Sequence, residues 1–179
     1  MEIKELERDE IERVRDIDRR EVIEGVYYHR DGRLVLVPER HDVVGWPPGA
    51  LEEHISSLRA CLDQGGVIFG AFSEDGRLQG IAAVGDRFFG TAADRLQLVF
   101  LHVSDGARGQ GLGSRLFAMA AHRAQACGAR VLYVSATPSE NTVDFYLGRG
   151  CRVADEVDAE LFALEPEDIH LEYVLSLPG

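Results

Sequence analysis

The stretch of residues 96–126 constrains the fold of this chain more strongly than any other. It begins with an apolar run, residues 96–103, that has the length and composition of a buried strand. A short loop follows, in which glycine recurs at every second position from Gly109 to Gly113. Apolar residues then recur at spacings of four, four and three, which predicts an amphipathic helix. The unit is therefore a strand, a glycine-rich turn and a helix.

The geometry of this turn suits the binding of an anion. The N–H groups of a first helical turn lack partners within the helix, and the helix dipole adds partial positive charge there. Glycines let the backbone approach a phosphate closely, and Arg108 adds a cation at the start of the loop. A tight connection that needs only flexible residues is the alternative. The alternating glycines after an arginine favour a phosphate site.

Two common nucleotide-binding motifs do not fit this loop. The Walker pattern requires a lysine and then serine or threonine after its last glycine, whereas Gly113 is followed by Ser114 and Arg115. The dinucleotide fingerprint requires a third glycine where Ser114 stands, and the strand lies in mid-chain rather than opening a repeated βαβ pattern. Binding of NAD or ATP is therefore a remote alternative.

The segment Arg108-Gly109-Gln110-Gly111-Leu112-Gly113 resembles the acyl-CoA pyrophosphate loop of the GNAT superfamily of N-acetyltransferases, written Gln/Arg-x-x-Gly-x-Gly/Ala. A second segment, residues 141–146 followed by Gly150-Cys151, is similar to the family's Asn-Ala-Val-x-Phe-Tyr and Gly-Phe. Two ordered motifs at a family-like separation are more specific than either alone. The resemblance covers about residues 96–153, and the rest of the chain is compatible with it.

This resemblance implies the fold. We expect one GNAT-like α/β domain over residues 1–179, with a mixed, mostly antiparallel sheet and helices on both faces. In this family two central parallel strands splay apart. The resemblance assigns those strands to residues 96–103 and 131–136, which are joined by a helical crossover.

The resemblance also implies acetyl-CoA as cosubstrate. The backbone of Leu101 and Val103 is expected to pair with the pantetheine arm, and Asn141 to lie on the cofactor side, although an N-cap role suits this asparagine equally well. The residues expected to bind the pyrophosphate are Arg108, Gly109, Gln110, Gly111, Leu112, Gly113 and Ser114.

In this family the amine attacks the thioester directly, without a covalent enzyme intermediate, so none of the three cysteines is assigned as a nucleophile. Tyr146 occupies the position of the family's general acid, which protonates the departing thiolate; a core aromatic is the alternative. An alkyl ammonium has a pKa of ~10.4, so the acceptor must lose a proton before it attacks.

The sequence does not identify the general base. In the histone-acetyltransferase branch a glutamate stands at what looks like Gln97, and a glutamine cannot accept that proton. The remaining candidates are Glu24 and Glu21, expected near the end of the first helix, and His102 on the central strand. A water chain to bulk solvent is a further alternative, and a satisfied strand histidine is the simpler explanation of His102.

Composition limits the partners. The formal net charge of -12 argues against nucleic acid and suits steering of a cationic amine, although plain solubility explains it as well. The acceptor is expected to be a primary amine of a small molecule or peptide. The cysteines and histidines lack metal-ligand spacing, so no metal site is expected. With no apolar run of membrane-spanning length, a cytoplasmic protein without membrane contact is expected.

Other questions stay open at this point. Homodimers are frequent in the family, and the sequence does not decide between a monomer and a homodimer. A non-catalytic acyl-CoA-binding regulatory module would keep the loop but tolerate loss of the acid. The irregular residues 39–49, which include Trp46, are expected either to grip the acceptor or to form a surface loop with a packed tryptophan.

The remaining patterns predict the other elements. Residues 1–24 are expected to form a short strand and then a charged helix, and Asp31-Gly32 predicts the turn of a hairpin. The other expected elements are a helix at residues 50–64, strands at 67–72 and 78–84, a short helix ending at Arg149, and a closing antiparallel pair at 151–157 and 169–175.

Overall fold

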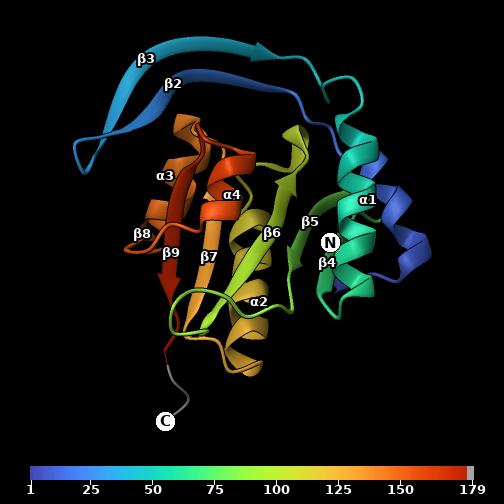
Figure 1. Ribbon diagram of the computed structural model, residues 1–179. Helices are drawn as coiled ribbons and strands as arrows, with labels where there is room; N and C mark the ends of the chain where they lie inside the picture. The colour runs from blue at the N-terminus through green and yellow to red at the C-terminus, as the bar shows by residue number, and fades with distance from the viewer. Residues whose placement is uncertain (177–179) are drawn as a thin grey trace.

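The computed structural model describes residues 1–176. Over this range the chain forms a seven-stranded sheet, with a separate two-stranded hairpin arching over one edge of it (Figure 1). In spatial order the strands of the sheet are β1 (Glu2–Glu5), β4 (Val67–Phe72), β5 (Leu78–Val84), β6 (Arg95–Val103), β7 (Val131–Ala136), β9 (Ile169–Val174) and β8 (Arg152–Val153). The hairpin consists of β2 (Glu21–Arg30) and β3 (Arg33–Val43).

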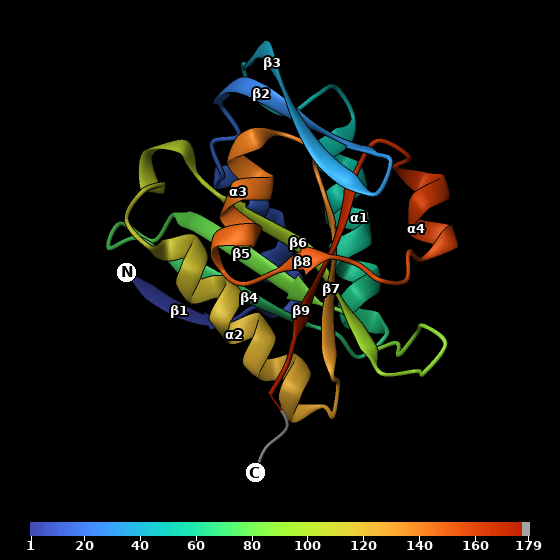
Figure 2. The same cartoon turned by 90° about the vertical axis from the view of Figure 1, so that its left-hand side faces the viewer.

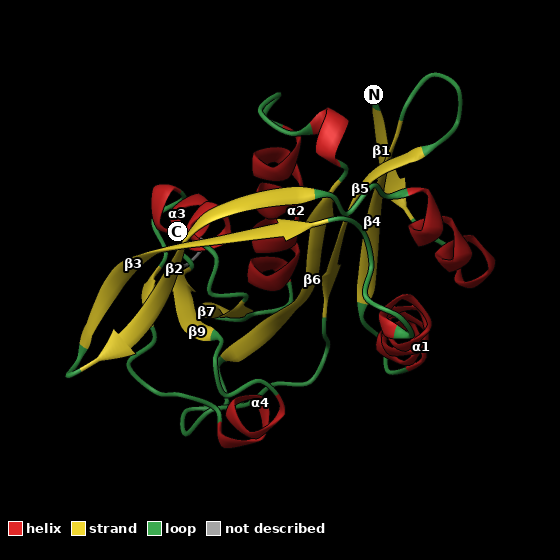
Figure 3. Ribbon diagram, turned by 90° about the horizontal axis from the view of Figure 1, so that it is seen from above, coloured by secondary structure: helices red, strands yellow, loops and turns green. Residues whose placement is uncertain are grey.

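Helices cover both faces of the sheet. Seen from above, α1 and α4 lie on one side and α2 on the other (Figure 3). The helices are α1 (Ala50–Asp63), α2 (Leu112–Ala126), α3 (Glu140–Gly148) and α4 (Ala159–Leu164), with 3-10 helices η1 (Arg8–Asp16) and η2 (Asp105–Ala107). Two apolar layers result: α2 and α3 enclose the larger with the sheet, and η1 and α1 enclose the smaller.

The central strands β6 and β7 are parallel and separate after a short contact. They pair only at Arg95, Leu96 and Gln97 of β6, although β6 continues to Val103. All other strand pairs of the sheet are antiparallel. The predicted fold class, a mixed sheet with a splayed central parallel pair and helices on both faces, is therefore confirmed.

A β-bulge reorients β6 at the point of separation. The pairing with β5 passes from Leu98 directly to Phe100, so Val99 is the extra residue. As a result Leu98 packs in the layer beneath α2, whereas Phe100 packs in the layer beneath α1. Because of the bulge, Leu98 and Phe100 face opposite sides of the sheet although they are two residues apart.

Most predicted elements lie where the sequence places them. Strands β4, β5 and β7 have the predicted bounds, and α1 ends one residue early. The hairpin turn is also confirmed: Asp31 has φ 49° and Gly32 has φ 75°, the left-handed pair that an Asp-Gly turn requires.

The prediction for residues 1–24 was wrong in its second half. The helical segment η1 ends at Asp16, and Glu21 and Glu24 lie in β2 instead of at a helix end. The β-branched and aromatic residues that follow Arg20 favour an extended chain, and pairing with β3 stabilises it. Residues 39–43, expected to be irregular, continue β3 for the same reason.

The hairpin is anchored on α3, as Figure 2 shows. The Tyr27 N–H donates to the Pro138 carbonyl at 2.7 Å, and the Tyr27 hydroxyl donates to Asp144 at 2.7 Å. A Cβ at Gly25 would lie 2.7 Å from a carboxylate oxygen of Glu140, so glycine allows β2 to approach α3 this closely. Across residues 1–176, no helix has the length and apolar character needed to cross a membrane.

Candidate active site

The candidate site lies where β6 and β7 separate. Because the two strands are parallel, their carboxyl ends meet at the same edge of the sheet, and α2 and α3 follow directly from them. The edge of β6 that faces β7 has no partner strand beyond Gln97. Its backbone groups there are available to an extended ligand, which would add to the sheet like a strand.

The glycine-rich loop forms an open cradle at the first turn of α2. Gly109 and Gly111 have φ of 73° and 77°, and a Cβ at either would meet nothing within 4 Å. Gly111 is the N-cap of α2, and no side chain of a described residue caps this helix. The first N–H groups of α2 are therefore available to an anion, and the phosphate site at this helix end stays a prediction.

Arg108 is placed beside the loop but binds the protein's own backbone. Its Nε donates to the Val103 carbonyl at 3.0 Å, and its Nη1 donates to the Arg20 carbonyl at 3.0 Å. The side chain therefore ties the end of β6 to the segment that precedes β2. A direct role for Arg108 in phosphate binding stays a prediction.

A cation that the sequence analysis missed lies at the same helix end. Arg149 Nη1 donates to Ser114 Oγ at 2.8 Å, and its guanidinium lies 5.0 Å from the centre of the Phe145 ring. Among the described residues, no carboxylate forms an ion pair with Arg149. The sequence shows Arg149 just before Gly150 of the second motif, but no pattern of neighbouring residues links Arg149 to the glycine-rich loop.

Tyr146 is buried in α3 against aromatic neighbours. Its ring centre lies 5.9 Å from that of Phe117 and 5.2 Å from that of Phe145. Burial raises the pKa of the Tyr146 phenol, so this side chain keeps its proton at neutral pH. The hydroxyl makes no hydrogen bond to the part of the chain that the structure describes. A protonated, unengaged phenol is the state that a general acid needs.

Asn141 does not cap α3. Ser139 is the N-cap, and its side chain accepts from the Thr142 N–H. The Asn141 amide instead donates to Glu21 Oε1 and to the Val22 carbonyl, both at 3.1 Å. Asn141 thus links α3 to the start of the hairpin, at the edge of the sheet where the candidate site lies.

The three candidate bases have different surroundings. Glu24 is exposed on β2 and is ion-paired with Arg40 at 2.9 Å. Glu21 is 10% exposed and binds Arg19 as well as Asn141. Burial, together with a smaller effect of the charge of Arg19, lowers the pKa of His102 to about 3, so this imidazole is neutral at pH 7 and is a weak base.

His102 belongs to an aromatic cluster on the α1 side of the gap. Its ring centre lies 4.5 Å from that of Phe100 and 5.2 Å from that of Trp46. Trp46 is held in place because its indole N–H donates to the Ile17 carbonyl at 3.1 Å. The segment that contains Trp46 therefore presents a packed tryptophan, and that tryptophan lies beside β6.

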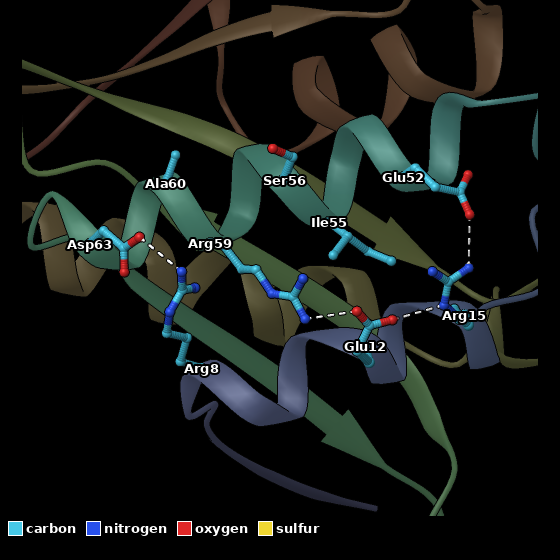
Figure 4. Close-up of a pocket in the computed structure, with 9 residues that line it drawn as sticks. All are labelled: Arg8, Glu12, Arg15, Glu52, Ile55, Ser56, Arg59, Ala60 and Asp63. Carbon is cyan, nitrogen blue, oxygen red and sulfur yellow. Dashed lines mark hydrogen bonds and ion pairs between the residues drawn. The ribbon is translucent and has the colours of Figure 1, made fainter.

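A pocket lies away from this gap. It has a volume of about 400 Å³ and is formed by η1 and α1 alone (Figure 4). Its arginines are neutralised by neighbouring carboxylates: Arg59 binds Glu12 at 2.7 Å and Arg8 binds Asp63 at 3.2 Å. This charge-balanced pocket offers no free cation or acid, so we do not assign the active site to it. Among the described residues there is also no cluster of potential metal ligands.

Comparisons with known proteins agree with the fold described above. Residues 23–150 match the model of the Acetyltransferase (GNAT) family. The structure is similar to that of nourseothricin acetyltransferase, with a TM-score of 0.73 and 19% identity over 98% of each chain. It is also similar to a candidate streptothricin acetyltransferase from Bacillus anthracis str. Ames in complex with acetyl coenzyme A, with a TM-score of 0.72 and 14% identity over 99% of this chain and 98% of that chain.

A third similar structure is N-acetylglutamate synthase from Neisseria gonorrhoeae, with a TM-score of 0.51 and 26% identity over 75% of this chain and 29% of that chain. A search of curated proteins found no match. The family match spans well over half of the chain. Of the two sequence motifs, the first forms the loop that leads from β6 into α2, and the second lies on α3, which follows β7. The chain therefore belongs to the GNAT family of acetyltransferases, as the two motifs predict.

Proposed function

We propose that this protein is an N-acetyltransferase that moves the acetyl group of acetyl-CoA to a primary amine of a small molecule or peptide. The amine attacks the thioester directly while both substrates are bound. The observation that carries the proposal is the separation of β6 from β7 beyond Gln97, directly beside the uncapped first turn of α2. This arrangement combines an unpaired strand edge with an anion cradle.

The residues present fit acetyl-CoA. The free edge of β6 near Leu101 and Val103 suits the amides of the pantetheine arm, and the open glycine loop suits the pyrophosphate. Arg149 adds a cation that is free of ion pairs with described residues. The bound cosubstrate supplies the activated acyl group, and the protein supplies the positions and the protons.

The chain's own groups promote the transfer in two ways. Backbone N–H groups at the end of β6 polarise the thioester carbonyl as it gains negative charge. Tyr146, protonated at neutral pH and buried in α3, donates its proton to the departing thiolate. For proton removal from the acceptor, the geometry favours Glu21 over Glu24, because Asn141 holds Glu21 at the carboxyl end of β7.

Thermal unfolding with acetyl-CoA, free CoA, NAD and ATP in separate samples tests the cofactor. A ligand at a hundred times its dissociation constant adds ~2.7 kcal/mol, which raises the midpoint of a domain of this size by roughly 5 to 11 °C. We expect a rise with acetyl-CoA and CoA only. A larger response to NAD or ATP, or none to CoA, would refute the assignment of the loop.

A screen of amines by thiol release then tests the reaction. Nourseothricin and streptothricin belong in this screen because two similar structures are named as acetyltransferases of these compounds. Binding of CoA without turnover of any amine would favour the alternative, a non-catalytic acyl-CoA-binding regulatory module. A cytoplasmic location and the extent of the domain over residues 1–179 stay predictions, and the choice between a monomer and a homodimer stays open.

A further inference from the structure

A second polar cluster lies on the face of the sheet opposite α2. Ser135 of β7 and His170 of β9 are directly paired, so their side chains share one face. Ser135 Oγ donates to Asp168 Oδ2 at 2.8 Å. Because Ser135 precedes the last residue of β7, the cluster lies at the edge of the sheet that holds the candidate site.

The hydrogen bonds of Tyr133 fix the tautomer of His170. The Tyr133 hydroxyl is buried and accepts from the Asp158 N–H at 3.0 Å. Within residues 1–176 the other group in hydrogen-bond contact with it is His170 Nδ1, 2.6 Å away, so we assign the hydroxyl as donor and Nδ1 as acceptor, because this leaves no buried hydroxyl proton unpaired. Burial lowers the pKa of His170, which favours the neutral ring. A neutral ring that accepts at Nδ1 carries its proton on Nε2. Since the two nitrogens lie on opposite sides of the ring, the Nε2–H faces away from Tyr133.

This N–H group has no partner in the folded chain. His170 is 6% exposed, and its Nε2 makes no hydrogen bond to any residue in the described range 1–176. Leaving a buried donor unsatisfied carries a free-energy cost, so such groups are few in folded proteins. The ring of Phe162 in α4, 6.0 Å away between centres, packs over His170. The donor is therefore held in place and oriented, and it is not used by the fold.

Asp168 complements this donor. Its Oδ2 is bound by Ser135, and among the described residues no arginine, lysine or histidine forms an ion pair with its carboxylate. The side chain is partly buried, where a carboxylate gains from a cationic partner. A carboxylate without an ion pair, in the bend just before β9, and an unpaired N–H donor in β9 thus lie two residues apart.

We propose that Asp168 and His170, held by Ser135 and Tyr133, bind the acceptor, with Asp168 on its ammonium group and the His170 Nε2–H on an uncharged oxygen. This assignment rests on the proposed function, and it names the class of acceptor that the proposed acetyltransferase uses. The acceptor is an amine with a neighbouring carbonyl or hydroxyl oxygen, as in an aminoacyl amide or a peptide N-terminus. A free amino acid fits less well, because Asp168 repels its carboxylate.

The position of the cluster agrees with this assignment. Figure 3 shows α2 and α3 on one side of the sheet and α1 and α4 on the other. Tyr146 packs in the apolar layer of α2 and α3, whereas His170, which is paired with Ser135, packs against Phe162 of α4. The acyl donor and the acceptor therefore reach the gap between β6 and β7 from opposite faces.

Three probes of similar size test the substrate class: L-alaninamide, L-alanine and isopropylamine, each assayed by thiol release from acetyl-CoA. We expect kcat/KM to be about tenfold or more higher for L-alaninamide than for isopropylamine, which leaves the donor unpaired. Equal values, or no turnover of any probe by protein that binds acetyl-CoA, would overturn the assignment. Protein that fails to bind acetyl-CoA would refute the proposed function, and this assignment with it.

Two variants test which residue produces the preference for L-alaninamide and which one binds the ammonium group. His170→Asn keeps an acceptor for the Tyr133 hydroxyl but removes the Nε2–H, so it should abolish the preference for L-alaninamide over isopropylamine. Asp168→Asn keeps the bond from Ser135 and should raise KM about tenfold for both amines, with KM for acetyl-CoA unchanged. Glu167→Gln, which removes an exposed charge one residue away, is the matched control. An unchanged preference in His170→Asn would contradict the proposal, and the probe comparison in the unmodified protein requires no variant to fold.

Discussion

At the scale of single residues, the proposed chemistry depends on groups that the fold leaves unengaged. Tyr146 keeps its proton because it is buried, and Arg149 forms no ion pair with the described part of the chain. By contrast, the predicted cation Arg108 is bound to two backbone carbonyls. Of these three residues, Arg108 positions the site, whereas Tyr146 and Arg149 are available to a substrate.

Tyr146→Phe should separate binding from chemistry. The change removes only a hydroxyl that makes no hydrogen bond within residues 1–176, so the fold should persist. A general acid contributes typically 10²- to 10⁴-fold, and we therefore expect kcat to fall by at least roughly 100-fold while CoA still shifts the unfolding midpoint. Tyr173→Phe, which alters another tyrosine packed on Phe117, is the control. Unchanged turnover in Tyr146→Phe would remove this residue from the mechanism.

Arg149→Met should weaken the binding of acetyl-CoA. A hydrogen bond to a charged group contributes about 1.5–3 kcal/mol, so we expect the Kd measured by calorimetry to rise by roughly ten- to a hundredfold. Repeating the titration with dephospho-CoA distinguishes the pyrophosphate from the 3′-phosphate, because only a contact to the pyrophosphate survives that change. Arg130→Met, beyond the opposite end of α2, is the control. Equal affinities of the Arg149 and Arg130 variants would contradict the role of Arg149.

At the scale of elements, the β6–loop–α2 unit holds the cradle, and a buried ion pair joins β6 to the strands beyond the gap. Glu172 of β9 is 1% exposed and binds Arg95 of β6 at 2.7 Å and Arg152 of β8 at 2.8 Å. Burial alone would raise the pKa of Glu172, but the hydrogen bonds from both arginines bring the net pKa below its usual value. This carboxylate therefore helps to hold together strands that do not pair along the gap.

Glu172→Gln should destabilise the protein by about 3 kcal/mol, because it leaves the buried charge of Arg95 with only its longer ion pair to Glu156, at 3.9 Å. Urea unfolding at pH 7 measures this loss. The lowered pKa also fixes a pH dependence: the stability that Glu172 adds is fully present above the unfolded pKa of 4.5 and is lost as pH falls through the lower folded value. Below pH 4.5 the unmodified protein should therefore approach the variant in stability. A constant difference down to pH 2 would contradict this account.

At the scale of the whole molecule, local patterns predicted the part of the fold that carries the cofactor. The strand, loop and helix of residues 96–126 are specified by neighbouring residues, and the two motifs identified the family. The helix predicted for residues 17–24 was wrong. A charged segment with few apolar residues fits a helix as well as a strand, and here its pairing with β3 decides for the strand. The six-residue α4 was missed because its sequence alone is too short to be a stable helix.

The site, like the fold, was predictable only where its residues belong to one contiguous motif. The phosphate loop and Tyr146 belong to contiguous motifs, so the sequence indicated them. Arg149 contacts Ser114, which is 35 positions away, and His170 contacts Tyr133, which is 37 positions away. Contacts over such separations arise only from the packing of the sheet and helices, and no local pattern contains them.

Hydrogen exchange with and without acetyl-CoA tests most directly the claim that the cosubstrate binds between β6 and β7. We expect new protection of the backbone amides at residues 98–103 and 109–114, where the free strand edge and the open loop lie. Amides lining the pocket between η1 and α1 should show no change. Protection confined to that pocket, or none at saturating acetyl-CoA, would contradict the account of this site.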